Sequence, residues 1–259
     1  GPPGVGKTFM CKRLAYSLMG AKDDDRVEMV QFHQAYTYED FIQGYRPSED
    51  GEGFRRENGT FFEFCERARQ AAPETPHVFI IDEINRGNLA KIFGELMMLV
   101  EPDKRGEEWG VPLQYSKPGE AEFSVPENVY LIGMMNTADR SLAMVDYALR
   151  RRFAFVDLEP QFNGEFEEYL TDKGADGEIT RMIVRRMRSL NESIADETAS
   201  LGEGFCIGHS YFVPRDSGSY GEAWYRRVIE YEVAPLLEEY WFDDRDRVRE
   251  EVDALLEGL

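Results

Sequence analysis

The chain has 259 residues, of which 50 are acidic and 30 are basic, so its formal net charge at neutral pH is −20. Such a surface opposes non-specific binding to nucleic acid, and no apolar run is long enough to cross a membrane. An apolar content of 42% at this length predicts one large globular domain, or a large domain with a smaller one. The excess of carboxylates suits a high-salt cytoplasm, so we expect a cytoplasmic protein from a halophilic source.

The first eight residues match the phosphate-binding pattern G-x-x-x-x-G-K-[ST] at every fixed position. In this pattern the glycines let backbone N–H groups turn toward phosphates, the lysine reaches the β- and γ-phosphates, and the hydroxyl residue ligates Mg²⁺. Lys7 is therefore also expected to be catalytic, and Thr8 to be a metal ligand. The expected phosphate-binding residues are Gly1, Pro2, Pro3, Gly4, Val5, Gly6, Lys7 and Thr8.

A helix is expected from Thr8 to about Met19, with its positive end pointing at the same anion. A phosphate loop also needs a strand that leads into it, yet the chain begins at the first glycine of the loop. We therefore expect the sequence to be a fragment that lacks this strand and whatever precedes it.

The run from Val78 to Ile81 is apolar, as in a strand that is covered on both faces, and two carboxylates follow it, Asp82 and Glu83. At this distance after a phosphate loop, the pattern predicts a Walker B strand. Asp82 would hold Mg²⁺ through water, and Glu83 would polarise the water that attacks the γ-phosphate. The two motifs together predict Mg²⁺-dependent hydrolysis of a nucleoside triphosphate, either GTP or ATP.

The elements between and after these motifs are expected from hydrophobic period and turn residues. In chain order, the first are a strand at 27–32, a structured loop at 33–47 with a short helix near 38–43, and a mobile segment at 48–59. A helix from 60 to about 72, capped by Thr60, and a helix from about 85 to 100 are expected next. They are followed by a hairpin with strands 111–115 and 121–125, a buried strand at 129–135, a helix at 141–149 and a strand at 153–158.

Asn136 follows the strand expected beside Walker B. Because open α/β sheets bind ligands beyond the carboxyl ends of their strands, we expect Asn136 to sense the γ-phosphate. After Pro160 only helical periods remain, around 162–170, 178–194, 221–240 and 245–256. The sequence thus predicts an α/β nucleotide-binding domain at 1–159 and an α-helical lid at 160–259.

Several segments together resemble the AAA+ motor domains of the McrB family, from the start of the chain to about Phe212. The phosphate loop and Walker B are common to a very large class of proteins, whereas the segment at Gln34-Ala35-Tyr36 and the run Met135-Asn136-Thr137-Ala138-Asp139-Arg140 favour McrB over MoxR-like and dynein-related ATPases. The segments are GPPGVGKT, VQFHQAYTYEDFIQGYRP, IIDEINRGN, GMMNTADRSLAMVDYALRRRF and FCIGHSYF.

The resemblance implies an AAA+ P-loop NTPase, with a parallel sheet flanked by helices and a smaller helical lid. It implies a homo-oligomeric ring, expected to be a hexamer, that prefers GTP and drives DNA translocation for an McrC-like endonuclease. DNA would be handled by a missing domain or by the ring pore, and no membrane is involved. Asn136 would be sensor 1, and Asp139 and Arg140 would complete the family signature at the nucleotide.

Arg151 most resembles an arginine finger, which one subunit inserts into the site of its neighbour to stabilise the transferring phosphoryl group. Arg150 and Arg152 are alternates, and Arg86 is a further candidate to face the neighbour. The competing interpretation is that these arginines pair with surface carboxylates.

The lid lacks the second sensor arginine that many AAA+ proteins carry, because the corresponding segment reads Gly208-His209-Ser210-Tyr211. His209 either replaces that arginine at the nucleotide or caps the next element. Tyr36, Tyr38 and Tyr45 could line a pore, although packing is the simpler role.

Two other functions fit the same motifs. One is a MoxR-like ATPase that remodels protein complexes, which an McrC-like partner or endonuclease activity would exclude. The other is a nucleotide-gated scaffold with little turnover, against which the presence of both Asp82 and Glu83 argues.

Overall fold

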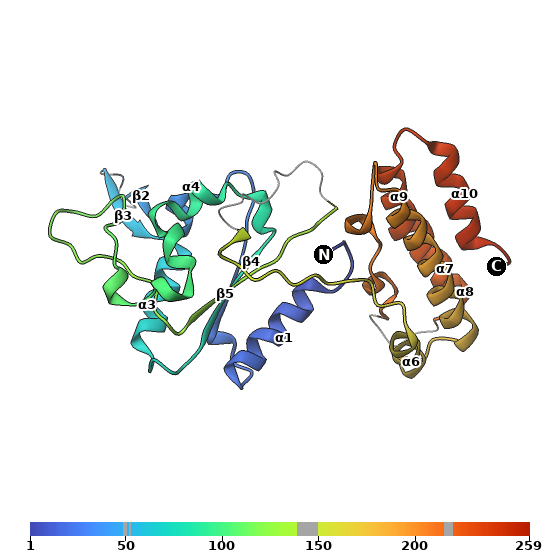
Figure 1. Cartoon of the computed structure of the whole chain (residues 1–259), viewed down its shortest axis with the longest axis horizontal. Coiled ribbons are helices and arrows are strands. Elements are labelled where there is room, and N and C mark those ends of the chain that lie inside the picture. The colour runs from blue at the N-terminus through green and yellow to red at the C-terminus, as the bar shows by residue number, and fades with distance from the viewer. Residues whose placement is uncertain (49–50, 52, 139–149, 215–219) are drawn as a thin grey trace. The chain divides into compact units, whose positions relative to one another are not determined.

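The computed structural model describes residues 1–48, 51, 53–138, 150–214 and 220–259 (Figure 1). The helix expected at 141–149 and the candidate site residues Asp139 and Arg140 lie outside these residues. Contacts divide the chain into two compact units. We call Thr8–Met135 with Arg140–Val156 the α/β unit, and Gly1–Lys7 with Asn136–Asp139 and Asp157–Leu259 the lid unit. The domain boundary expected at residue 160 stays a prediction.

The α/β unit is built on a parallel sheet in the order β1-β4-β5, with β1 at Val27–Gln31, β4 at His77–Asp82 and β5 at Val129–Gly133. In β4, Val78 and Ile80 pack with Ala15 of α1 (Lys7–Met19), whereas Phe79 and Ile81 belong to the core on the other face. This alternation follows from the two-residue period of a strand. The expected parallel sheet with flanking helices is therefore confirmed.

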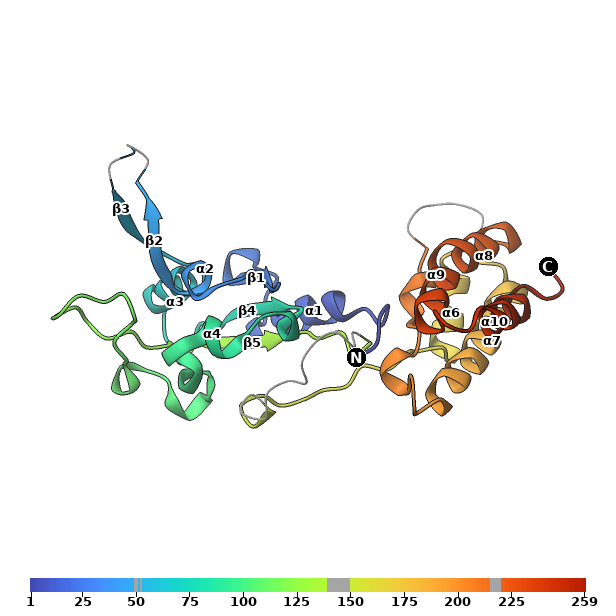
Figure 2. The ribbon, with the colours of Figure 1, turned by 90° about the horizontal axis from the view of Figure 1, so that it is seen from above.

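The second face of the sheet is covered by α2 (Tyr38–Phe41), α3 (Thr60–Gln70) and α4 (Leu89–Phe93), of which Figure 1 labels α3 and α4 and Figure 2 labels all three. Aromatic rings fill this layer: the centroids of Phe41 and Phe61 lie 4.8 Å apart, and Phe79 of β4 lies 5.1 Å from Phe61. Ring pairs at such distances add to the free energy gained by burial. The central strand is thus fixed from both sides.

The segment expected as one helix over 85–100 is broken into three short pieces. They are a 3₁₀ turn at Ile84–Arg86, then α4, then a 3₁₀ helix at Gly94–Val100. Asn88 caps α4 by accepting a hydrogen bond from the Lys91 N–H, and Gly94 ends it with a φ of 51°. A single helix was therefore the wrong expectation, because the left-handed backbone at Gly94 cannot continue an α-helix.

Residues 43–58 contain a hairpin where a loop and a mobile segment were expected. Strands β2 (Gln43–Pro47) and β3 (Phe54–Asn58) pair antiparallel in a ribbon that stands away from the main sheet (Figure 2). Most of its side chains are exposed, including 72% of Phe54. Since neither face of the ribbon enters a core, its strands lack the alternation of apolar residues by which strands are recognised.

The cap expected at Thr60 is formed by Gly59 instead. A Cβ atom at Gly59 would lie 2.4 Å from the carbonyl carbon of Phe41, so this close backbone approach requires glycine. The Thr60 hydroxyl instead forms a hydrogen bond of 3.1 Å with the Tyr36 hydroxyl.

Two other expected β elements are reduced. The hairpin at 111–125 is a single antiparallel bridge between Val111 and Phe123, preceded by 3₁₀ turns at Pro102–Lys104 and Glu107–Trp109. Residues 153–158 form no strand, since no described strand pairs with them. A further 3₁₀ turn, Asp24–Arg26, leads into β1.

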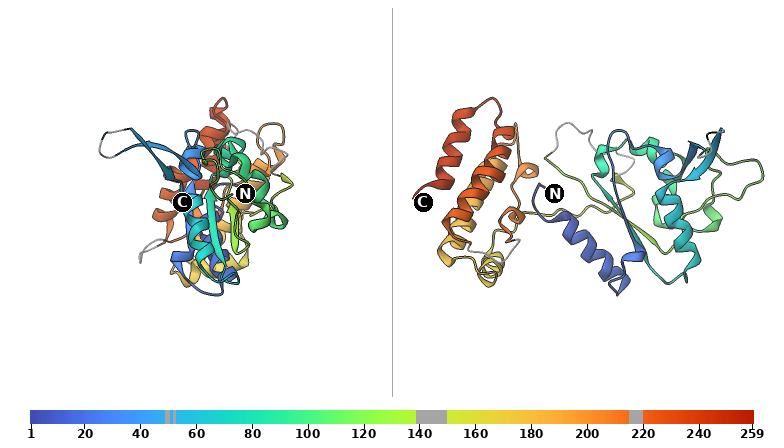
Figure 3. Two further views of the ribbon diagram at one scale, coloured as in Figure 1. Left: turned by 90° about the vertical axis from the view of Figure 1, so that its left-hand side faces the viewer. Right: turned by 180° about the vertical axis from the view of Figure 1, so that it is seen from behind.

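The lid unit is a helical bundle (Figure 3). Its longest helix, α7, buries Ile183, Met187, Leu190 and Ile194 at helical spacing against the other lid helices. The elements are α6 (Gly164–Asp172), α7 (Gly177–Asp196), 3₁₀ turns at Glu203–Phe205 and His209–Phe212, α8 (Glu222–Val228), a π-helical turn at Ile229–Val233, α9 (Ala234–Tyr240) and α10 (Arg245–Leu256).

The helix expected over 221–240 contains that π turn. Pro235 has no N–H and cannot donate to the carbonyl of Tyr231, and the Ala234 N–H bonds to Ile229, five residues back. Of the helices in the described ranges, none is both long and apolar enough to span a bilayer.

Candidate functional site

The phosphate loop lies in the lid unit and has the backbone that its motif requires. Gly4 and Gly6 have φ angles of 73° and 79°, a region that favours glycine. Lys7 begins α1, and its Nζ donates to the carbonyl oxygens of Gly1 and Pro2 at 2.9 and 2.8 Å. The ammonium group is thereby held at the loop. A loop of this kind at the start of a helix can bind an anion through backbone N–H groups.

A lid segment lies directly against this loop. The Gly208 N–H donates to the Pro3 carbonyl and the Ser210 N–H donates to the Gly4 carbonyl, both at 2.8 Å. A Cβ atom on Gly4 would lie 2.4 Å from the Tyr211 ring. Sequence reasoning singled out this segment for its missing arginine and overlooked the signal that was present, which is Gly208.

His209 lies beside these contacts with its ring among aromatic side chains. Its Nδ1 accepts a hydrogen bond of 3.1 Å from the Gln161 N–H, and its ring is 5.4 Å from that of Phe166 and 6.5 Å from that of Phe162. Burial lowers the pKa of His209. A neutral imidazole that anchors Gln161 is what these contacts describe, and a role at the phosphates stays a prediction.

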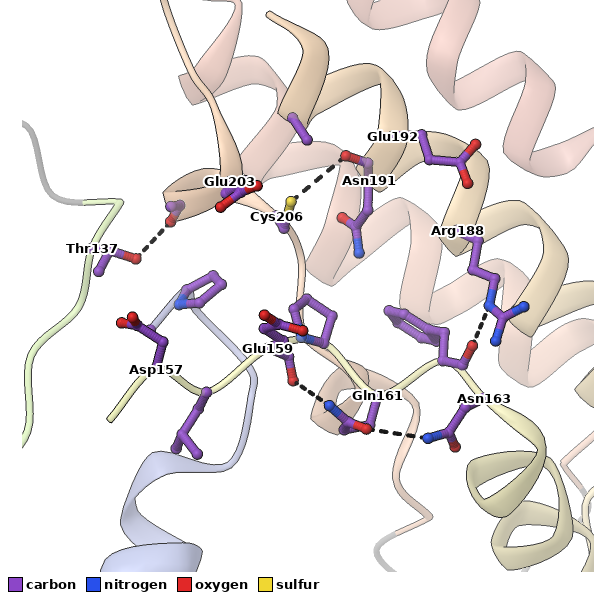
Figure 4. A pocket seen from close by; sticks show the side chains of 17 residues that line it. Thr137, Asp157, Glu159, Gln161, Asn163, Arg188, Asn191, Glu192, Glu203 and Cys206 are labelled. Atoms are coloured by element: carbon purple, nitrogen blue, oxygen red, sulfur yellow. Dashed lines mark hydrogen bonds between the residues drawn. The ribbon is translucent and has the colours of Figure 1, made fainter. Parts of the chain in front are cut away.

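The lid unit also contains a cavity of about 760 Å³ next to the phosphate loop (Figure 4). Its wall comes from Gly1 and Pro2, from residues 157–163 and from α7, and its volume is in the range of small-molecule sites. Two of its polar residues are engaged: Arg188 donates to the Phe162 carbonyl, and Asn191 bonds to Ile207. The carboxylates at its wall are Asp157, Glu159, Glu192 and Glu203.

Sequence reasoning missed this cavity because its residues come from several distant segments. The segment that carries Asn136 also reaches the loop. The Thr137 N–H donates to the Gly1 carbonyl at 3.2 Å, and its hydroxyl donates to the Gly204 carbonyl at 2.9 Å. Asn136 itself accepts a bond of 3.3 Å from the Ala138 N–H. The structure therefore places the expected sensor segment beside the start of the phosphate loop.

The two Walker B carboxylates lie in the α/β unit at the carboxyl end of β4. An oxygen of Asp82 accepts a bond of 3.0 Å from the Glu83 N–H. Glu83 has a φ of 50°, and no other non-glycine residue among those described has a positive φ. Neighbouring strands fix the turn, because Phe32 donates to the Asp82 carbonyl and Ile84 donates to the Met134 carbonyl, both at 2.9 Å. Such backbone strain is found where a functional side chain must be aimed.

The residues expected to hold Mg²⁺ fit that ion chemically. Burial and, next, the charge of Asp82 raise the pKa of Cys11. Cys11 is three residues after Thr8, so the Asp82 carboxylate lies near the helix face that also carries the Thr8 hydroxyl. Hydroxyl and carboxylate oxygens are ligands that Mg²⁺ accepts, with phosphate oxygens and water completing its shell. Among the described residues no three His, Cys, Asp or Glu side chains could hold a metal by themselves.

The candidate arginines have different surroundings. Arg86 forms an ion pair of 3.2 Å with Glu83, and Arg152 forms one of 3.0 Å with Glu101. A hydrogen bond from Lys104, and then the charges of Arg152 and Arg151, hold the pKa of Glu101 below its usual range. The guanidinium of Arg150 lies 5.9 Å from the Phe155 ring centroid. Arg151, the expected finger, is exposed, and its role in a neighbouring subunit stays a prediction.

Of the three tyrosines considered for a pore, Tyr36 and Tyr38 pack within the α/β unit and Tyr45 does not. The Tyr38 hydroxyl donates to Glu95 at 2.5 Å, and the Tyr36 ring lies 4.8 Å from that of Phe32. Tyr45 is 47% exposed on the ribbon.

Comparison with known proteins gives two family matches, the AAA domain (dynein-related subfamily) over residues 1–153 and the McrB alpha-helical lid domain over 182–249. The Type IV methyl-directed restriction enzyme EcoKMcrB subunit of Escherichia coli (strain K12) is 57% identical over 247 residues, which cover 94% of this chain and 53% of that protein. The Type II restriction enzyme BsuMI component YdiS of Bacillus subtilis (strain 168) is 29% identical over 194 residues, or 61% of this chain and 55% of that protein.

The chain therefore spans about half the length of the curated relatives that it matches. The first family match includes both the phosphate loop and the Asp82–Glu83 turn, and the second lies within the helical bundle. The resemblance to McrB is thus confirmed, and the chain belongs to the dynein-related subfamily of AAA domains, with an α-helical lid of the McrB type.

Proposed function

We propose that this chain is the motor domain of an Mg²⁺-dependent nucleoside triphosphatase that drives DNA translocation for an McrC-like endonuclease in the restriction of modified DNA. The observation that carries the proposal is the combination of a phosphate loop in its left-handed glycine conformation with a strained carboxylate, Glu83, at the end of the central strand. Both relatives bear the names of restriction enzymes, which supports the biological setting.

The side chains divide the work of hydrolysis. The loop N–H groups and Lys7 bind the phosphates, and Thr8 and Asp82 hold Mg²⁺, which when bound neutralises phosphate charge. Glu83 orients the attacking water and accepts its proton, while Asn136 donates to the γ-phosphate. The activated water attacks the γ-phosphate directly, so no covalent intermediate forms. Positioning and electrostatic stabilisation supply most of the rate.

The cavity beside Pro2 would receive the nucleoside. Its wall carries several carboxylates, including Glu192 and Glu203, and these accept hydrogen bonds from ring N–H and amino groups. Guanine presents two such groups on one edge and adenine presents only its amino group, so GTP is the favoured substrate and ATP the alternative.

The assembly would be a ring, taken as a hexamer, in which Arg151 of one subunit reaches the nucleotide of the next. The DNA would be handled by the ring pore or by a domain outside this chain. The two relatives are named as a subunit and a component of restriction enzymes, which supports a motor that works with a partner nuclease.

The decisive experiment measures turnover of GTP and of ATP by the full-length protein, with and without its partner, beside Lys7→Ala. Loss of nucleotide binding in Lys7→Ala, with normal binding in the surface variant Lys22→Ala, is expected because only Lys7 lies at the phosphate loop. Unchanged binding in Lys7→Ala would overturn the proposal. No DNA cleavage by the reconstituted pair, together with remodelling of a protein client, would favour the MoxR-like alternative.

A further inference from the structure

In the contact between the lid segment Gly208–Ser210 and the phosphate loop, the lid donates the hydrogen bonds and the loop accepts them, which affects how the loop would bind an anion. Two lid N–H groups, those of Gly208 and Ser210, donate to the carbonyl oxygens of Pro3 and Gly4 at 2.8 Å each. The acceptors belong to consecutive peptide units of the loop, Pro3–Gly4 and Gly4–Val5. The lid therefore holds the orientation of both peptide planes.

In a trans peptide unit the C=O and N–H bonds point in opposite directions, because the unit is planar. Since no peptide bond among the described residues is cis, fixing the Pro3 and Gly4 carbonyls toward the lid turns the N–H groups of Gly4 and Val5 away from it. These are N–H groups of the phosphate-binding motif. The lid thus orients donors with which the loop would bind an anion.

The approach is too close to be incidental surface packing. A Cβ atom on Gly208 would lie 1.9 Å from the carbonyl carbon of Gly4 and 2.3 Å from the Val5 nitrogen. The preceding residue is held on both sides by Asn191, which donates to the Ile207 carbonyl at 2.9 Å and accepts from its N–H at 2.7 Å. The segment is therefore anchored in the lid while it grips the loop.

We propose that Gly208 and Ser210 are positioning residues that preorganise the phosphate loop from the lid, through two backbone hydrogen bonds and without any charged side chain. The inference rests on the proposed function, since it concerns the same nucleotide site. It assigns the lid a share of phosphate affinity that no residue of the loop motif itself supplies.

The test compares Gly208→Ala with Gly221→Ala in the full-length protein. Gly221 is also a lid glycine, but a Cβ atom there would meet nothing within 4 Å. Gly208→Ala is expected to raise the KM for GTP or ATP and the inhibition constant of inorganic pyrophosphate by the same factor, between about 10-fold and 100-fold, as for hydrogen bonds to a charged group. Gly221→Ala should change neither constant.

Pyrophosphate isolates the loop because it has no nucleoside to bind elsewhere. A raised KM with an unchanged pyrophosphate constant would place the loss outside the phosphate loop and overturn the inference. Equal constants for Gly208→Ala and Gly221→Ala would do the same while leaving the proposed function intact. If the unaltered protein binds neither nucleotide nor pyrophosphate, the proposed function itself fails.

A second measurement uses the unaltered protein, in case Gly208→Ala does not fold. Coupling between sites is reciprocal, so pyrophosphate binding must stabilise the two lid hydrogen bonds as much as they stabilise binding. Hydrogen exchange at the Gly208 and Ser210 amides is expected to slow by about 10-fold or more when pyrophosphate saturates the loop. Unchanged exchange at both amides would overturn the inference.

Discussion

The phosphate loop and the Asp82–Glu83 turn reach their functional conformations by different means. The loop depends on tertiary hydrogen bonds, because its Pro3 and Gly4 carbonyls are held by Gly208 and Ser210, far along the chain. The turn follows a strand of which five successive residues are buried, and neighbouring strands hold its ends. Burial secures the carboxylates that we propose to be catalytic, whereas long-range hydrogen bonds secure the N–H groups that we propose to bind phosphate. Substitutions should therefore separate catalysis from binding.

The largest effect is expected from Glu83→Gln, which keeps the shape of the side chain and removes its ability to accept a proton. Turnover should fall by about 10²-fold to 10⁴-fold, the usual contribution of a general base, with nucleotide affinity unchanged. Steady-state turnover and equilibrium binding of a non-hydrolysable analogue measure the two quantities. Glu63→Gln, on the exposed face of α3, is the control. Equal turnover in Glu83→Gln and the parent would instead support the nucleotide-gated scaffold.

Ile81→Ala tests whether burial secures the turn. Ile81 is fully buried next to Asp82, so truncation should lower the free energy of unfolding by about 2–5 kcal/mol. Urea denaturation measures the loss, and Ile183→Ala in the equally buried lid core is the matched control. Turnover should fall in Ile81→Ala while the inhibition constant of pyrophosphate stays the same. In Gly208→Ala, by contrast, that inhibition constant should rise. A changed inhibition constant of pyrophosphate in Ile81→Ala would show that the phosphate loop and the Asp82–Glu83 turn are not held independently of each other.

A smaller effect is expected from the strain at Glu83. With the carboxylate removed in both variants, Glu83→Gly should be more stable than Glu83→Ala by about 1 kcal/mol, because glycine adopts a positive φ without steric cost. Parallel thermal or urea denaturation measures the difference. If alanine is as stable as glycine there, the backbone of the turn is not strained.

The smallest effect concerns an ion pair between Arg56 of the ribbon and Glu120. Arg56 donates to both oxygens of Glu120, at 2.6 and 2.8 Å, and this bond and then the Lys117 N–H lower the pKa of Glu120 to about 2. A carboxyl whose pKa is lower in the folded state stabilises the fold at pH values above its pKa in the unfolded state, which is about 4.3. This contribution is lost as the pH falls toward the pKa of the folded state.

Glu120→Gln should therefore have a lower urea midpoint than the parent at neutral pH, by a small margin that narrows from about pH 4 to about pH 2. Glu122→Gln, an exposed carboxylate on the same loop, is the control. A margin that is constant with pH would mean that the Arg56 pair does not contribute to stability.

The parts of the site that sequence predicts are those carried by contiguous residues. The phosphate loop and the Asp82–Glu83 strand could be identified because a few adjacent residues determine both backbone shape and chemistry. The parallel sheet could be predicted from the short apolar runs of its strands. The lid helices could be predicted from the helical spacing of their apolar residues, but the π turn near Pro235 could not.

What sequence did not predict depends on contacts between distant residues or on single glycines. The β2–β3 ribbon has no buried face, and Gly94 interrupts a run whose apolar period continues past it. The contacts of Gly208 and the wall of the cavity join segments that are far apart in sequence. Local propensity contains no information on such contacts.

The environment of Cys11, beside Asp82, has a practical consequence when it is considered with the other two thiols. Burial raises the pKa of Cys65 and of Cys206 as well, so at any given pH each of the three native cysteines holds less thiolate than an exposed cysteine does. Since the thiolate is the form that reacts with maleimides, a single cysteine introduced on an exposed helix should label selectively. Fluorophores for following this domain through its cycle could then be attached without first replacing the native thiols.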